Sequence, residues 1–393
     1  MGHPVYRDMP TTIFEEMSGL ARAHGAVNLG QGFPDDPGPL GVRAKAAEAV
    51  LDGYNQYPPM SGLPELRQAI AGHYGRRQDL DLDWSTEVTV TSGATEALAS
   101  AFFALIQPGD EVVVFQPFYD AYLPLIRRAG GIVRLVTLQP PHWRLDRAAL
   151  EAAIGPKTRL LVLNNPNNPA GAVSPAEDLA LLAEVCIAHD LIAVCDEVWE
   201  QVTFEGRGHQ PLMALPGMRE RTVKIGSAGK MFGLTGWKVG FLCATPALTQ
   251  ALARAHQFLT FTTPPNLQVA VAWGLNEDAD WFTAMPADLQ RSRDRLGASL
   301  SAAGFSVLAA PATYFLIVDL AASGVTEGDR AFCLRAVTQA GVAAIPVSAF
   351  YETDAPSHLI RLCFAKQDEV LDEAVRRLSH ARDLSRAALS VST

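Results

Sequence analysis

The sequence is poor in the residues that would build a disulfide framework or a metal site. Its 393 residues include five cysteines, an odd number, and none stands in a C-x-x-C pair or in a Cys/His spacing typical of zinc. We therefore expect the cysteines to be small buried hydrophobic residues in a reducing compartment. They are Cys186, Cys195, Cys243, Cys333 and Cys363.

The chain also lacks long apolar runs and an excess of positive charge. No stretch approaches the roughly 20 apolar residues that a membrane helix needs. The first ten residues show no basic region followed by an apolar one, as a secretion signal would. The net charge of −10 repels nucleic acid and anionic membrane surfaces. These features predict a cytoplasmic protein that binds neither nucleic acid nor membrane.

Repeats and low-complexity tracts are absent, and the length suffices for two or three domains with a large core. Short apolar runs that predict strands lie at 88–91, 111–115, 159–163, 191–195 and 223–225. The run at 191–195 is continuously apolar, which is typical of a parallel sheet covered on both faces. The first part of the chain therefore favours the α/β class.

The C-terminal part has a different pattern, which predicts a smaller α+β layer. Strands are expected at 314–318, 342–346 and 359–365, and helices at 328–340 and 367–384.

Polar residues follow several of the predicted strands. The turn Gly93-Ala94-Thr95 opens a helix, whose free backbone N–H groups suit a phosphate dianion. Two Asn-Pro pairs force a turn over 164–171. Asp196 ends a strand at the edge where open α/β sheets bind ligands, and an ionised Asp there needs a cationic partner.

Three basic residues stand in informative places. Lys230 lies in a turn rich in Ser and Gly, three residues after Ser227, and Lys238 follows eight residues later among glycines. Arg361 lies in the middle of an apolar strand, where a charge must be paired. Its partner is either the α-carboxylate of a substrate, which guanidinium binds with two parallel hydrogen bonds, or an acid within the chain.

These motifs stand in the order, and at about the spacing, of the fold-type I aminotransferases that use pyridoxal phosphate (PLP). The resemblance runs from about Asn28 to Ala365, and the chain looks most like the branch of kynurenine, glutamine and methionine aminotransferases. It implies a mostly parallel seven-stranded sheet flanked by helices, plus a smaller α+β domain. The implied division is 1–44 for an N-terminal arm and part of the small domain, 45–284 for the large PLP-binding domain and 285–393 for the small C-terminal domain.

The resemblance also implies roles for single residues. Lys230 would form the Schiff base with the PLP aldehyde, and Asp196 would hold the ring nitrogen protonated, which makes the ring an electron sink. Asn168 would donate to the phenolic oxygen of the cofactor and touch the substrate carboxylate. Tyr119 would stack on the ring, and Tyr57 would contact the phosphate of the neighbouring subunit. The other implied PLP-binding residues are Ala94, Thr95, Trp199, Ser227 and Lys238.

Trp199 departs from the family, most of which has Tyr at this position. The family Tyr hydrogen-bonds the phenolic oxygen of the cofactor, whereas an indole N–H donates but cannot act as an acid with the pKa of a phenol. The departure leaves a carbon–sulfur β-lyase, acting on cystathionine or cysteine conjugates, as an alternative activity on the same fold.

The expected reaction moves the α-amino group of a neutral, large, aromatic or sulfur-containing amino acid to a 2-oxo acid. Methionine, kynurenine and phenylalanine are of this type, and an N-succinyldiaminopimelate-type aminotransferase is a further alternative. The resemblance assigns the substrate carboxylate to Gly32, Asn168 and Arg361, and an apolar side-chain pocket to Phe14 and Phe261. Since Tyr57 and Phe261 would reach the neighbouring site, we expect a homodimer with shared active sites. A regulatory or scaffolding protein on this fold is the remaining alternative.

Overall fold

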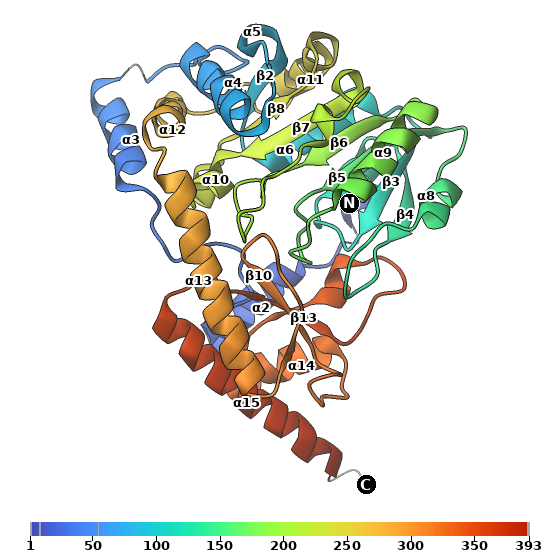
Figure 1. Ribbon diagram of the computed structural model, residues 1–393, viewed down its shortest axis with the longest axis vertical. Coiled ribbons are helices and arrows are strands. Elements are labelled where there is room, and N and C mark those ends of the chain that lie inside the picture. Colours follow the sequence, from blue (N-terminus) through green and yellow to red (C-terminus); the bar gives the residue numbers. More distant parts are fainter. Residues whose placement is uncertain (1, 8, 54, 391–393) are drawn as a thin grey trace.

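A seven-stranded sheet forms the centre of the larger body in the computed structural model, which describes residues 2–7, 9–53 and 55–390 (Figure 1). The strand order is β2-β8-β7-β6-β5-β3-β4. Strand β8 pairs antiparallel with β2 and β7, and the other pairings are parallel. The strands are β2 (Val88–Thr91), β3 (Glu111–Gln116), β4 (Ile132–Thr137), β5 (Thr158–Asn164), β6 (Ile192–Asp196), β7 (Thr222–Ser227) and β8 (Gly240–Cys243).

Helices cover both faces of this sheet because its inner strands are apolar on both sides. Val112 and Val114 of β3 pack in one core cluster, together with Phe102 of α6. Val113 points the other way, into a second cluster that holds Leu182 of α9, as expected when side chains alternate along a strand. The helices of this body are α3 (Leu40–Asp52), α4 (Pro64–Gln78), α5 (Trp84–Glu87), α6 (Ala94–Leu105), α7 (Tyr122–Arg128), α8 (Arg147–Ala152), α9 (Ala176–Ala188), α10 (Ala228–Met231), α11 (Pro246–Leu259) and α12 (Pro265–Glu277).

The smaller body contains an antiparallel sheet with the order β12-β13-β10-β9, and helix α13 runs from the larger body down its side (Figure 1). The N-terminal segment joins this body, because β1 pairs in parallel with β11. The elements are α2 (Ile13–Ala23), β1 (Val27–Asn28), α13 (Trp281–Ala302), β9 (Ser306–Val307), β10 (Phe315–Asp319), α14 (Asp329–Arg335), β11 (Val342–Ala343), β12 (Ile345–Pro346), β13 (Leu359–Cys363) and α15 (Asp368–Ser390). The short helix α1 (Pro4–Arg7) instead packs on α7 of the larger body.

The structure confirms the predicted fold class, an α/β body with a mostly parallel seven-stranded sheet beside a smaller α+β body. All five cysteines are buried and form no disulfide, as expected. The single strand predicted at 342–346 is wrong, because β11 pairs with β1 whereas β12 pairs with β13. The predicted domain boundaries stay a prediction. Within the described ranges no helix is long and apolar enough to cross a membrane.

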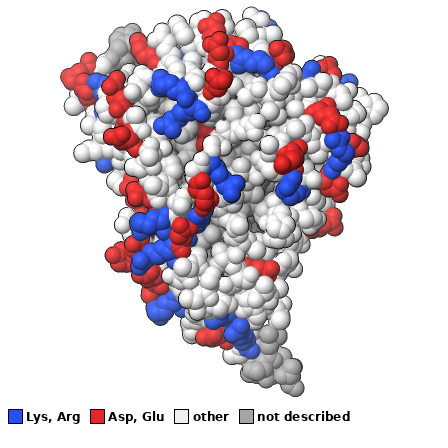
Figure 2. All heavy atoms as spheres, viewed as in Figure 1, with Lys and Arg blue, Asp and Glu red and all other residues white. Residues whose placement is uncertain are grey.

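Acidic and basic side chains are interspersed on the face shown in Figure 2. Helices α13 and α15 illustrate this arrangement, since Arg291 pairs with Asp368 at 3.0 Å and Arg295 with Asp372 at 2.7 Å. Such exposed pairs contribute little to stability, typically about 0–1 kcal/mol each.

A fully buried ion cluster lies beside β7, and removing one of its members costs more stability than breaking an exposed pair. Lys224 Nζ lies 2.6 Å from Glu200 Oε2 and also contacts the Glu197 carboxylate, and all three side chains are inaccessible to solvent. The Tyr74 hydroxyl donates to Glu200 Oε1 at 2.7 Å, and His209 Nε2 lies 3.0 Å from Glu197 Oε2. The cluster therefore fixes β7 against the turn that follows β6.

We predict that Lys224→Met destabilises the protein by about 3–5 kcal/mol, because two buried carboxylates lose their shared ammonium partner. Urea unfolding measures this free energy. Lys157→Met is the control, since Lys157 is exposed and forms no ion pair among the described side chains, and its expected change is within about 0.5 kcal/mol. Equal unfolding midpoints for the two variants would contradict the prediction.

Candidate active site

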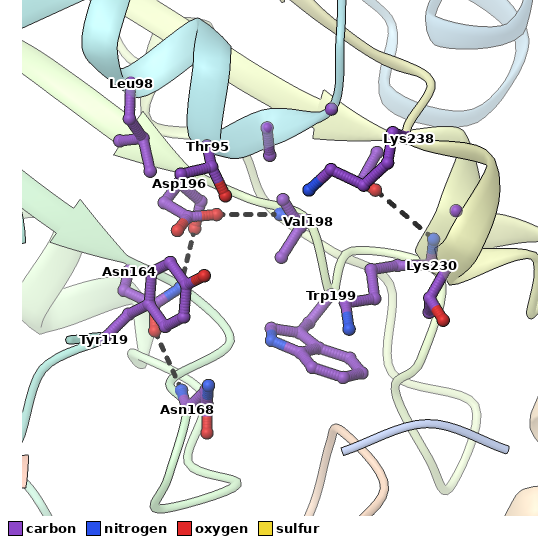
Figure 3. Close-up of a pocket in the computed structure, with 15 residues that line it drawn as sticks. Thr95, Leu98, Tyr119, Asn164, Asn168, Asp196, Val198, Trp199, Lys230 and Lys238 are labelled. Carbon is purple, nitrogen blue, oxygen red and sulfur yellow. Dashed lines mark hydrogen bonds between the residues drawn. The ribbon is translucent and has the colours of Figure 1, made fainter. Parts of the chain in front are cut away.

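A cavity of about 200 Å³ lies at the carboxyl ends of β5, β6 and β7, beside the start of α6 (Figure 3). This is the edge where open α/β sheets bind ligands, because adjacent strands deliver their last side chains to one place. The predicted residues that line it are Ala94, Thr95, Tyr119, Asn168, Asp196, Trp199, Ser227, Lys230 and Lys238.

One end of the cavity is suited to an anion. The first N–H groups of α6, at Ala94 and Thr95, have no carbonyl partner within the helix. Gly93 precedes them with φ of +80°, and a Cβ there would lie 3.1 Å from Lys238 Nζ. The positive φ favours glycine at this position, and a Cβ would also crowd the end of the Lys238 side chain. The hydroxyl of Ser227 and the ammonium of Lys238 complete a site for a phosphate dianion.

Lys230 lies on α10, one turn of helix directly after β7, and its side chain extends to the indole of Trp199 (Figure 3). Its Nζ lies 3.1 Å from the hydroxyl oxygen of Tyr314 and 4.6 Å from the centre of the Trp199 ring. The pKa of the Lys230 amine is lowered to about 8, chiefly by burial; the positive charges of Arg361 and Lys238 act in the same direction, and the charges of Cys363 and Asp196 oppose them. A substantial fraction of the amine is therefore neutral, and hence nucleophilic, near pH 7 to 8.

Asp196 is buried at the end of β6. Its Oδ2 accepts a hydrogen bond from Tyr122 at 2.6 Å, and Oδ1 accepts one from the backbone N–H of Val198 at 3.4 Å. Burial raises its pKa to about 6, although these hydrogen bonds act in the opposite direction. Asp196 lines the cavity, and no described cation forms an ion pair with it. A carboxylate in such a place can stabilise the protonated nitrogen of a ring.

Asn168 connects this edge of the sheet to the smaller body. Its backbone N–H donates to Asn164 Oδ1 at 2.8 Å, and Asn164 Nδ2 donates to the backbone oxygen of Asp196 at 3.0 Å. Asn168 Oδ1 accepts a hydrogen bond from Arg361 Nη1 at 2.8 Å. The turn over 164–171 therefore holds Arg361 beside the cavity.

Arg361 is 1% exposed, and Nη2 donates to the backbone oxygen of Gly30 at 2.9 Å. Its guanidinium carbon lies 3.9 Å from the centre of the Phe315 ring, 5.1 Å from that of Phe350 and 5.2 Å from that of Phe14. In the part of the chain that the structure describes, no carboxylate pairs with it, and Nε has no hydrogen-bond partner. The internal ion pair considered above is therefore not observed, and burial lowers the pKa of Arg361 to about 10.

Five predicted residues do not line the cavity. Arg361, Gly32 and Phe14 lie next to it, where the Gly32 carbonyl accepts from Tyr314 at 2.6 Å and Phe14 lies beside Arg361. Tyr57 and Phe261 contact one another with ring centres 5.6 Å apart, and their side chains are 80% and 40% exposed. Their expected place in a neighbouring subunit stays a prediction.

Sequence reasoning missed Tyr122 and Tyr314. Tyr122 carried no helical signal, because Tyr119 lies in the loop before α7 and Tyr122 is the first residue of that helix. Tyr314 carried none, since it is 84 residues from Lys230 and meets it only through the packing of the two bodies.

The family model for aminotransferase class I and II matches residues 25–378. This chain belongs to the class I and II aminotransferases. Enzymes of this family use PLP, and the residues present fit it, with a lysine amine, a carboxylate without a cation and an anion site around one cavity.

Relatives of this aminotransferase match nearly its whole length. A probable N-succinyldiaminopimelate aminotransferase of Mycobacterium tuberculosis is 44% identical, with 95% of this chain and 96% of that one covered. The methionine aminotransferase of Escherichia coli is 42% identical, with 94% and 95% covered. Human kynurenine–oxoglutarate transaminase 1 is 36% identical, with 91% and 93% covered.

Solved structures agree with this assignment. The N-succinyldiaminopimelate aminotransferase of M. tuberculosis superposes with a TM-score of 0.94 at 44% identity, covering 97% of this chain and 100% of that one. The E. coli methionine aminotransferase superposes with a TM-score of 0.93 at 40% identity, covering 97% and 99%. The fold is therefore that of the fold-type I aminotransferases.

We predict that the Lys230 amine of the cofactor-free enzyme reacts with formaldehyde and cyanoborohydride with a half-maximal rate near pH 8, because only the neutral amine attacks. Mass spectrometry of a digest measures methylation at Lys230 as a function of pH. Nα-acetyl-lysine, whose side chain has the ordinary pKa of 10.5, is the control. If the methylation rate of Lys230 rose only over the pH range in which that of Nα-acetyl-lysine rises, the lowered pKa would be contradicted.

Proposed function

We propose that this aminotransferase moves the α-amino group of a neutral amino acid with a large side chain, of the methionine, kynurenine or phenylalanine type, to a 2-oxo acid. The observation that carries the proposal is the buried guanidinium of Arg361, which has aromatic neighbours and forms no ion pair among the described residues, where Asp120 acts on it only from a longer distance. An α-carboxylate supplies the missing anion, and apolar rings beside it favour an uncharged side chain. Two of the relatives are named for methionine and kynurenine.

The proposed reaction divides the work between the cofactor and the chain. When bound, PLP supplies an aldehyde that bonds to amines and a ring that accepts electrons. Lys230 Nζ first holds the cofactor and then accepts the proton that leaves the substrate α-carbon. Asp196, oriented by Tyr122, would keep a proton on the ring nitrogen, and Tyr119 would shield the ring. Ser227, Lys238 and the start of α6 bind the phosphate.

Two alternative activities make different demands on the site. An N-succinyldiaminopimelate-type substrate carries distal carboxylates, whereas the described cations that line the cavity are Lys230 and Lys238, both assigned to the cofactor. A β-lyase releases pyruvate and needs no 2-oxo acid. Substrate tests can therefore separate the three activities.

We predict that methionine, phenylalanine and kynurenine convert the absorbance band of the holoenzyme to that of the aminated cofactor, and that a 2-oxo acid restores it. Their kcat/KM should exceed that of aspartate or N-succinyldiaminopimelate by about 100-fold, because a distal carboxylate would enter without a cation. A preference for aspartate or for N-succinyldiaminopimelate would contradict the proposed substrate. Pyruvate released from cystathionine without a 2-oxo acid would favour the lyase.

Arg361→Lys tests the carboxylate site in the same assay. It should lower kcat/KM for methionine by about 100-fold, because ammonium cannot form the bidentate pair. Arg295→Lys, at an exposed pair on α13, should leave kcat/KM unchanged. If both variants kept the parent value, Arg361 would not bind the substrate.

We further propose a homodimer in which each active site takes residues from both subunits. The support is an exposed apolar patch of Tyr57, Phe258, Leu259 and Phe261. Phe258 is 86% exposed at the end of α11, which is unusual for a side chain of this size in a monomer. A second copy of the chain would cover this patch.

The native mass should be twice 42.2 kDa, and Phe258→Asp should move it towards the monomer, because a carboxylate would be buried in the interface. Light scattering after size exclusion measures both masses. Ile187→Asp is the matched control, since Ile187 is 45% exposed on α9, away from the patch. A monomeric parent enzyme would contradict the proposed dimer.

A further inference from the structure

Among the described side chains, Tyr314 forms a hydrogen bond with the amine of Lys230 through its hydroxyl group. We propose that Tyr314 is a positioning residue whose oxygen accepts a hydrogen bond from Lys230 Nζ and so turns the nitrogen lone pair towards the cavity. This inference rests on the proposed function of Lys230. Tyr314 belongs to the smaller body, so this body contributes a residue to the active site of the larger one.

The direction of the two hydrogen bonds follows from their partners. Tyr314 Oη lies 2.6 Å from the carbonyl oxygen of Gly32 and 3.1 Å from Lys230 Nζ. A carbonyl oxygen only accepts, so the single phenol proton of Tyr314 is donated to Gly32. The phenol oxygen then offers a lone pair to Lys230, and an N–H of the amine donates to it. Burial raises the pKa of Tyr314 well above its usual value, which keeps the phenol protonated for Gly32.

Trp199 closes a second side of the amine. Its ring centre lies 4.4 Å from that of Tyr314, with the two planes at 88°, and 4.6 Å from Lys230 Nζ. The amine therefore sits in a corner made by an indole face and a phenol oxygen. Trp199 has no hydroxyl, so the phenol beside Lys230 comes from Tyr314, the residue before β10, and not from the turn after β6.

The partner of Tyr314 belongs to the loop that also holds the substrate-binding arginine. The carbonyl of Gly30 accepts from Arg361, and the carbonyl of Gly32, two residues later, accepts from Tyr314. A Cβ on Gly32 would lie 3.0 Å from Phe315 Cζ, so a glycine lets the loop come this close. The orientation of the Tyr314 hydroxyl thus depends on this loop being in place.

Tyr314→Phe removes the hydroxyl and keeps the ring that packs on Trp199, so the variant should fold. The phenol oxygen stabilises the ammonium form of Lys230 more than the amine. Its loss should therefore move the half-maximal pH of Lys230 methylation in the cofactor-free protein down by about one pH unit from the parent value. In the holoenzyme kcat should fall by about tenfold to 100-fold, because the amine loses its orientation, while KM for the amino acid stays within about twofold.

Tyr351→Phe is the matched control, since its buried hydroxyl has no hydrogen-bond partner, and it should change neither the methylation profile nor kcat. An unchanged methylation midpoint in Tyr314→Phe would overturn the inference, because a purely packing role leaves that midpoint in place. A fall in kcat matched by an equal rise in KM would also overturn it. A parent enzyme that forms no absorbance band with PLP would instead refute the proposed function, so the two failures are distinguishable.

Discussion

The active site depends on buried charged groups that form no ion pair with another described residue. Placing an ionised group inside a protein costs several kcal/mol unless a partner compensates it. Behind β7 this compensation is complete, since Lys224 lies between Glu197 and Glu200. At the cavity it is incomplete, because Asp196 and Arg361 are both buried and neither forms an ion pair among the described residues. In the proposed function, the protonated ring of the cofactor pairs with Asp196 and the substrate carboxylate pairs with Arg361.

The fold brings these groups together from three parts of the chain. The parallel sheet delivers Asn164, Asp196 and Ser227 to one edge, because β5, β6 and β7 end there. The smaller sheet contributes Arg361 from β13, and Tyr314 directly precedes β10. The loop after β1 lies against both of these through the carbonyl oxygens of Gly30 and Gly32. A displacement between the two bodies would therefore change the surroundings of the lysine and of the arginine together.

The parts that the sequence could predict are those set by local pattern. Asp196 follows a continuously apolar strand, and Gly93 opens a helix, so their place at the sheet edge followed from the parallel arrangement. The contact between Lys230 and Tyr314 could not be predicted, because no local pattern links residues 84 apart. Likewise, the sequence predicts one strand at 342–346. The structure divides it into β11 and β12, because β11 pairs with β1 whereas β12 pairs with β13. The sequence marks Trp199 as a departure from the family, whereas the position of Tyr314 beside it follows only from the structure.

Lys230 is proposed to hold the cofactor of this aminotransferase, and one measurement tests this role directly. Borohydride reduction of the PLP-loaded enzyme fixes the cofactor covalently to the amine that binds it, and peptide mass spectrometry then locates the added group. We expect the added group on Lys230 and none on Lys238, which lies in the same cavity but is assigned to the phosphate. A pyridoxyl group on Lys238, or on no lysine of the cavity, would contradict this role of Lys230.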